Sequence, residues 1–215
     1  DLPRSRGLGD VYKRQADDYK GLKMRMPGLG GRTIGKLGAT AVLMGGPDIL
    51  TSLASGAIDA AEWICPVADL GLGMHQAAKF YYGPGWHEPS TLLDLSIDLK
   101  EWEGLDADTQ ALMMEMAKAF NVDVFSRFQA LNGPALGKLL NEHGVQLKTF
   151  PDELLIALGN AAGEVMEERG SIDSQTKAIC NHILSFRKNI MDWSTKGESE
   201  FARIRNLPFK FPDSV

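Results

Sequence analysis

The sequence predicts an α/β fold made of βαβ units. Short segments with strand-like patterns occupy residues 22–26, 41–44, 57–61 and 91–96, and helical segments lie between them. Strands that alternate with helices favour a parallel sheet covered by helices. From Ala16 onward no repeat, low-complexity tract or obvious linker interrupts this pattern. A chain of 215 residues with 44% hydrophobic side chains can bury a substantial core in one or two lobes.

The first expected strand carries an arginine at its carboxyl end. Leu22-Lys23-Met24-Arg25-Met26 alternates apolar and basic side chains, as a half-buried strand does. Pro27-Gly28-Leu29-Gly30-Gly31 ends this strand, and residues 32–37 are expected to form a helix. A guanidinium group at this place can hold a carboxylate through two parallel hydrogen bonds, which makes Arg25 a candidate ligand-binding residue. An ordinary surface salt bridge is the alternative interpretation.

A later segment places a carboxylate beside a tryptophan. Residues 55–63 are interpreted as a helix end closed by Gly56 in a left-handed turn, followed by a short strand at 57–61. Glu62 and Trp63 then fall at the carboxyl end of that strand, where open α/β sheets bind their ligands. The alternative is a solvated acid beside a half-buried ring.

A second acid–tryptophan pair, Trp86 and Glu88, lies within residues 84–89. Two matching pairs indicate the lining of a small polar pocket. Two carboxylates would repel an anionic ligand unless a cation lies between them. A hard cation such as Na⁺ or Ca²⁺ takes oxygen ligands, which Glu62, Glu88 and a ligand carboxylate can supply.

Other classes of site are disfavoured. Four histidines are scattered along the sequence, at His75, His87, His143 and His182. They lack the spacing of zinc ligands, and each is expected to be a surface or packing residue. The role of His87 is the most open of the four, because it lies between Trp86 and Glu88. The two cysteines form no C-x-x-C motif. The net charge of −5 offers no basic footprint for nucleic acid, and no apolar run approaches the roughly 20 residues of a membrane span.

The carboxyl-terminal half is expected to be mainly helical. Asp106 or Asp108 can cap a helix that runs on from Thr109, along which apolar side chains recur every fourth residue. Apolar–polar alternation predicts a strand at 145–150, and Pro151-Asp152-Glu153 is expected to open a helix. Recurring apolar side chains predict a last long helix that starts near Ser171 or Asp173. The tail at 207–212 is too apolar for a free end, and packs either on a partner or on its own chain.

These motifs together resemble a known family. Gly21-Leu22-Lys23-Met24-Arg25, Leu37-Gly38-Ala39-Thr40, residues 55–63 and Trp86-His87-Glu88-Pro89 are similar to segments of the solute-binding proteins of TRAP transporters. The similarity is greatest to the branch that captures 2-oxo acids and related monocarboxylates, and it extends from about Asp18 to the end of the chain.

The resemblance implies a role for each candidate residue. Arg25 would clamp the ligand's carboxylate, and Glu62 and Glu88 would hold a cation, Na⁺ or Ca²⁺. Trp63 would add a main-chain oxygen and a pocket wall, and Trp86 would help to exclude water. The family implies a two-lobed, non-catalytic periplasmic receptor without an organic cofactor, which closes on its ligand and delivers it to the TRAP membrane subunits. Relatives of this branch also form dimers through carboxyl-terminal helices.

The expected domain organisation follows from where the resemblance begins. Residues 1–15 look non-native, as from sequence joined to a truncated gene, although a divergent native linker is the alternative. Residues 16–90 are expected to form the ligand-binding α/β lobe. Residues 91–215 would provide a segment crossing between lobes, at 91–96, and a helical region. The chain is therefore expected to be the carboxyl-terminal portion of a two-lobed protein that lacks most of the first lobe.

Two rival functions remain open. An enzyme could use Glu62 and Glu88 as an acid–base pair on a sugar or small carboxylate. A dinucleotide fold is weakly supported, because Thr33 stands where the last glycine of G-x-G-x-x-G belongs. The effector module of a transcription regulator shares the two-lobed design, but would need a DNA-binding helix-turn-helix that the sequence does not display.

Overall fold

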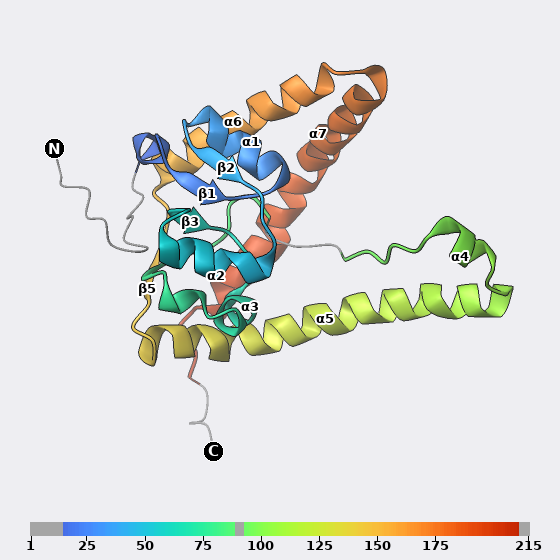
Figure 1. The fold of residues 1–215 in the computed structure, drawn as a ribbon, viewed down its shortest axis with the longest axis horizontal. Coiled ribbons are helices and arrows are strands. Elements are labelled where there is room, and N and C mark those ends of the chain that lie inside the picture. Colours follow the sequence, from blue (N-terminus) through green and yellow to red (C-terminus); the bar gives the residue numbers. More distant parts are fainter. Residues whose placement is uncertain (1–14, 89–92, 211–215) are drawn as a thin grey trace. The chain divides into compact units, whose positions relative to one another are not determined.

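The computed structural model describes residues 15–88 and 93–210. The chain divides into two compact units, one ending at Ala162 and the other beginning at Gly163. The elements, many of which are labelled in Figure 1, follow in the order η1 (Ala16–Tyr19), β1 (Lys23–Arg25), α1 (Gly28–Lys36), β2 (Thr40–Val42), α2 (Gly46–Ser55), β3 (Ala60–Ala61), α3 (Pro66–Gly71), η2 (Met74–Gln76), β4 (Phe80–Tyr82), α4 (Leu99–Glu103), α5 (Ala107–Asn141), β5 (Gln146–Lys148), α6 (Asp152–Gly170), α7 (Ser174–Ser194), η3 (Thr195–Ser199) and α8 (Glu200–Arg205).

The first sheet is parallel and has the order β2-β1-β3. It confirms the expected βαβ arrangement of the first three strands, each of which is shorter than predicted. The helix expected at 32–37 begins earlier, at Gly28, so the glycine segment is helix rather than loop. Packing explains the difference: a Cβ atom on Gly31 would lie 2.6 Å from the carbonyl oxygen of Met26 and 3.0 Å from Cβ of Ala41. Glycine is required there for close approach of the helix to the sheet.

The segment before the third strand is a turn held by a side chain. Gly56 has φ +74, which confirms the predicted left-handed close of α2. Asp59 donates its N–H to the carbonyl oxygen of Lys23, and its carboxylate Oδ2 accepts the N–H of Lys23 at 2.8 Å. Of the strand expected at 57–61, only Ala60–Ala61 pairs with β1, because Asp59 makes its link partly through its side chain.

The second sheet pairs β4 with β5 in parallel. The strand expected at 145–150 is confirmed as β5, whereas β4 was not predicted. The strand expected at 91–96 is wrong as far as the structure describes it, since residues 93–96 form no strand and residues 91 and 92 lie outside the described ranges. Alternating apolar residues there find no neighbouring strand, and Leu93 and Leu95 are exposed.

The long helix α5 begins where the sequence predicts. Asp106 is its cap, accepting the N–H of Thr109 at 2.9 Å, and the helix continues for 35 residues through Pro134. Its predicted apolar stripe is largely exposed: only Ala135 and Leu139 of this helix are buried. Asp173 likewise caps α7, in the second unit, by accepting the N–H of Thr176.

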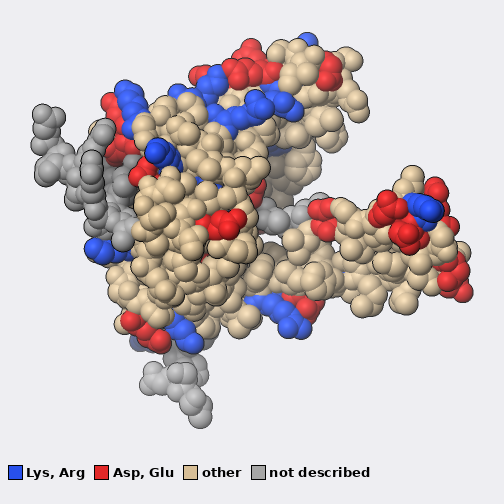
Figure 2. Space-filling view, in the orientation of Figure 1, with Lys and Arg blue, Asp and Glu red and all other residues tan. Residues whose placement is uncertain are grey.

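Two buried clusters flank the first sheet. One contains Tyr19, Leu22, Met26, Ile34, Leu154 and Leu158, and Trp86 packs against it. The other contains Ile49, Leu53, Ile58 and Ala77, and Trp63 packs against it. Within residues 15–88 and 93–210 no helix is both long and apolar enough to cross a membrane. On the face drawn in Figure 2, acidic and basic side chains are interspersed.

Candidate functional site

Strand register brings Arg25 and Glu62 together. Arg25 ends β1 and pairs with Ala61, the last residue of β3, so that Glu62 follows directly on the neighbouring strand. The N–H of Glu62 donates to the carbonyl oxygen of Arg25 at 3.0 Å. Because the strands are parallel, both side chains emerge at the carboxyl edge of the sheet, as the sequence predicts.

Arg25 and Glu62 form a buried ion pair. Their side chains are 9% and 8% exposed, and Nη1 of Arg25 contacts Oε1 of Glu62. Nη1 also donates to the carbonyl oxygen of Glu62 at 3.0 Å, and Nε donates to that of Met44 at 3.3 Å. The guanidinium group lies over the ring of Trp63, 4.9 Å from its centroid. The alternative of an exposed surface salt bridge at Arg25 is therefore wrong.

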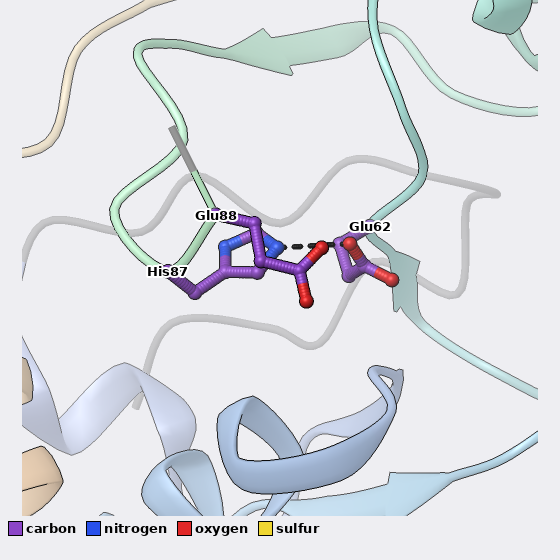
Figure 3. A group of neighbouring side chains, drawn as sticks. All are labelled: Glu62, His87 and Glu88. Carbon is purple, nitrogen blue, oxygen red and sulfur yellow. Dashed lines mark hydrogen bonds and ion pairs between the residues drawn. The ribbon is translucent and has the colours of Figure 1, made fainter. Parts of the chain in front are cut away.

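His87 completes a three-residue cluster with Glu62 and Glu88. Nε2 of His87 lies 2.8 Å from Oε2 of Glu62. One donor atom from each of Glu62, His87 and Glu88 lies within 4.8 Å of the others. Figure 3 shows the side chains of His87 and Glu88 directed toward Glu62 from the segment after β4. Two carboxylates and a ring nitrogen at this spacing are suited to holding a metal cation.

The sequence interpretation missed His87. It was expected to be a surface or packing residue, because histidines at these positions have no zinc-ligand spacing. The structure corrects this: His87 is only 16% exposed in its side chain and contacts the carboxylate of Glu62 across 25 residues. Its place between Trp86 and Glu88, two residues already singled out, was the available signal.

The two tryptophans line the site from opposite cores. Trp63 packs on the cluster around Ile49, and its ring lies so close to Gly46 that a Cβ atom there would approach it to 2.8 Å. Trp86 packs on the other cluster and meets His87 edge-on, with ring centroids 5.2 Å apart. Both rings thus have fixed positions set by apolar packing on the sheet's two sides.

A cavity of about 810 Å³ opens beside these groups, entirely within the first unit. Among its lining residues are Glu62, Trp63, Trp86, His87 and Glu88. Arg25 is not among the described residues that line the cavity. All five candidate residues therefore gather at one place, but the arginine is engaged by Glu62 rather than presented to the cavity.

Residues 13–171 match the family described as bacterial extracellular solute-binding protein, family 7. The chain belongs to this family. It is a family of solute receptors rather than enzymes. The chain is 36% identical over 197 residues to a monocarboxylate 2-oxoacid-binding periplasmic protein of Nostoc sp., covering 90% of this chain and 54% of that protein.

Solved structures confirm the fold of this family member. A TRAP periplasmic solute-binding protein of Pseudoalteromonas atlantica with bound sodium and pyruvate matches with TM-score 0.85 and 30% identity, over 95% of this chain and 61% of that one. One of Colwellia psychrerythraea with bound calcium and pyruvate matches with TM-score 0.83 and 31% identity, over 92% and 60%. The resemblance to TRAP solute-binding proteins and the α/β binding-protein fold are thus confirmed. The chain spans between about half and three fifths of these relatives' lengths.

Proposed function

We propose that this chain is part of an extracytoplasmic receptor that binds a small carboxylate, such as a 2-oxo acid, together with Na⁺ or Ca²⁺. The observation that carries the proposal is the buried Arg25–Glu62 pair beside His87 and Glu88 at the edge of one cavity. It combines a cationic group for an anionic ligand with an acidic cluster for a cation. Relatives at 30% and 31% identity hold pyruvate with sodium and with calcium.

The cation follows from electrostatics. Glu62 and Glu88 would repel an incoming carboxylate, and a cation between them removes that repulsion. In the proposed site, Glu62 and Glu88 supply carboxylate oxygens and Trp63 supplies a main-chain oxygen. Trp63 and Trp86 form walls that exclude water, which strengthens both charge interactions.

Arg25 links the two ligands. Its guanidinium group is the counter-charge of Glu62 in the present structure. A cation bound to Glu62 would take over that role and release the arginine to hold the ligand's carboxylate with parallel hydrogen bonds. Each ligand then promotes binding of the other, since linkage between two binding equilibria is reciprocal.

The wider role is transport. In this proposal the receptor acts in the periplasm and hands its ligand to TRAP membrane subunits. A homodimer through the carboxyl-terminal helices is part of the proposal, supported by the exposed apolar side chains of α7. These are Ile179, Ile183, Leu184, Phe186, Met191 and Trp193.

Calorimetric titration of the 215-residue chain tests the proposal. Pyruvate, a longer 2-oxo acid and lactate are added with Na⁺, with Ca²⁺ and with chelator. We expect cation-dependent binding of at least one carboxylate without turnover. Glu88→Gln should weaken the cation dependence, whereas Glu142→Gln, an exposed glutamate after α5, should not. Absence of carboxylate binding under every cation condition would reject the proposed function.

A further inference from the structure

The two acidic segments of the proposed cation site come from different sheets. Glu62 follows β3 in the first sheet, and Glu88 lies on the segment that follows β4 in the second. Among the described residues β3 and β4 share no sheet, so strand register does not set the distance between the two carboxylates. The contact of His87 with Glu62 joins the two segments at the site itself, and a contact further from the site can hold them at the spacing seen in the cluster.

A partly buried hydrogen bond connects the two elements that adjoin these segments. Asp69 lies on α3, which begins at Pro66 directly after the Glu62 segment, and Tyr81 is the middle residue of β4. The hydroxyl of Tyr81 donates to Oδ2 of Asp69 at 2.5 Å. Asp69 is 7% exposed. A hydroxyl bound to a buried carboxylate is among the stronger hydrogen bonds, and losing one partner leaves the other unsatisfied.

The groups that shift the pKa of Asp69 include a residue of the proposed site, Glu62. Burial raises the pKa of Asp69, while the hydrogen bond from Tyr81 and the N–H groups of Ile64 and Cys65 act in the opposite direction. The charge of Glu62 also raises the pKa of Asp69, so the two carboxyl groups interact. Asp69 is therefore near both the chain that leaves Trp63 and the strand that leads to Glu88.

A second contact fixes the start of α3. The N–H of Val67 donates to Oδ1 of Asn132, on α5, at 3.2 Å. The start of α3 is thus anchored on α5, and its fourth residue, Asp69, on β4. Because α3 is held at both Val67 and Asp69, it can fix the position of the Glu62 segment relative to the Glu88 segment.

We propose that Asp69 and Tyr81 are positioning residues of the cation site, holding the Glu62 and Glu88 segments at the distance that lets both carboxylates reach one ion. This inference rests on the proposed function, because it assigns the pair a role in that site. Neither residue contacts the ion; both act through the segments that carry its ligands. Groups hydrogen-bonded directly to metal ligands typically change metal affinity by about 10–100-fold when they are removed, and Asp69 and Tyr81, one contact further out, should act at the lower end of that range.

Terbium luminescence tests this role on the 215-residue chain. Tb³⁺ stands in for Ca²⁺, and its emission lifetimes in H₂O and D₂O give the number of water molecules on the ion. Tyr81→Phe should weaken Tb³⁺ binding about 10-fold or more and should add water to the ion, because one carboxylate no longer reaches it. Ser126→Ala, which removes an exposed hydroxyl from α5, is the control and should leave both readings unchanged.

A second pair of variants separates positioning from general stability. Asp69→Asn keeps an oxygen that accepts the Tyr81 hydroxyl, and should retain the native affinity and water number. Asp69→Leu cannot accept it, and should behave like Tyr81→Phe. Thermal unfolding of every variant is followed in parallel, and these two variants decide the matter should Tyr81→Phe not fold.

The outcomes distinguish this inference from the proposed function. If the unaltered chain takes up neither Tb³⁺ nor Ca²⁺, the cation site itself is rejected. If it binds Tb³⁺ but Tyr81→Phe matches it in affinity and water number, the positioning role is rejected and the proposed function stands. A fall in unfolding temperature with an unchanged water number also rejects positioning, since the pair would then only stabilise the fold.

Discussion

The molecule contains ion pairs in two opposite settings, the cavity edge and the surface of α5. Arg25 and Glu62 have side chains 9% and 8% exposed. Along α5, Lys118 pairs with Glu115 and Arg127 with Asp123, with all four side chains at least 51% exposed. A buried pair loses hydration that its attraction only partly repays, whereas an exposed pair loses little and gains little.

The difference in burial between these pairs indicates which of them has a functional explanation. Replacing a buried ion pair by apolar residues is often neutral or stabilising, so a pair like Arg25–Glu62 is weak evidence for a stabilising role. Its place at the carboxyl edge of the sheet, beside His87 and Glu88 in a group that could hold a cation, favours a different explanation. The pairs on α5 are local, three or four residues apart, and need no function beyond helix support.

Arg25→Ala should separate the two settings most strongly. It leaves Glu62 buried without its guanidinium partner, a change that typically costs about 3–5 kcal/mol of unfolding free energy. Pyruvate binding should weaken by about 2–5 kcal/mol, because the ligand's carboxylate loses its charged partner in the proposed site. Urea unfolding and calorimetric titration measure the two effects. Arg32→Ala, at an exposed position of α1, is the matched control and should change neither. Unchanged pyruvate affinity in Arg25→Ala would remove Arg25 from the site.

Alkaline pH should reveal a second difference between buried and exposed groups. Burial, with Tyr82 nearby, raises the pKa of Tyr19 from 10.0 to about 12. Above pH 10 the unfolded chain therefore loses this proton before the folded chain does. Unfolding free energy should fall as pH rises from 10 to 12, by at most about 1.4 kcal/mol per pH unit for this group. Denaturant unfolding at several pH values measures the slope, and Tyr19→Phe should reduce it. An equal slope in that variant would contradict the assignment to Tyr19.

Gly46→Ala tests how closely the ring of Trp63, which lines the cavity, is packed against α2. The new Cβ atom would lie 2.8 Å from the ring of Trp63, so the ring must shift from its place over Arg25. Overpacking of this kind typically costs about 1–3 kcal/mol. Gly35→Ala, in α1, meets no atom within 4 Å and is the control. Tryptophan fluorescence and pyruvate titration report the shift, and identical results for both variants would show that the Trp63 ring is loosely held.

Local signals predicted the ends of elements well. Asp106 and Asp173 cap their helices, and Gly56 takes the left-handed turn, because each depends on residues only a few positions away. The early start of α1 was missed, since it depends on the contact of Gly31 with Met26 and Ala41. β4 was missed because Phe80-Tyr81-Tyr82 is a run of aromatic residues without apolar–polar alternation, and it forms because β5 lies beside it.

In the candidate site, too, some contacts were predictable from the sequence and others were not. Arg25, Glu62 and Trp63 were predicted to share one place because strand ends of a parallel sheet meet at one edge, and the register confirms that placement. The contact of His87 with Glu62 joins segments that follow strands of two separate sheets, and the Asp69–Tyr81 bond joins a helix to the second sheet, so strand register could predict neither. The roles of Arg25, Glu62, Trp63, Trp86 and Glu88 in binding stay predictions, as does a domain boundary near residue 90.

Arg127→Ala should have the smallest effect and completes the comparison. Arg127 donates to Oδ2 of Asp123 at 2.7 Å, one turn earlier on α5, and the side chains are 71% and 51% exposed. Such exposed i, i+4 pairs contribute about 0.3–0.5 kcal/mol. Urea unfolding should show a loss of that size that disappears in high salt, because exposed charges are screened. In a salt that contains neither Na⁺ nor Ca²⁺, the Arg25–Glu62 pair should respond much less, since a buried pair is screened less than an exposed one. If both pairs lost equal stability with salt, burial would not separate them, and the cavity-edge pair would need no functional explanation.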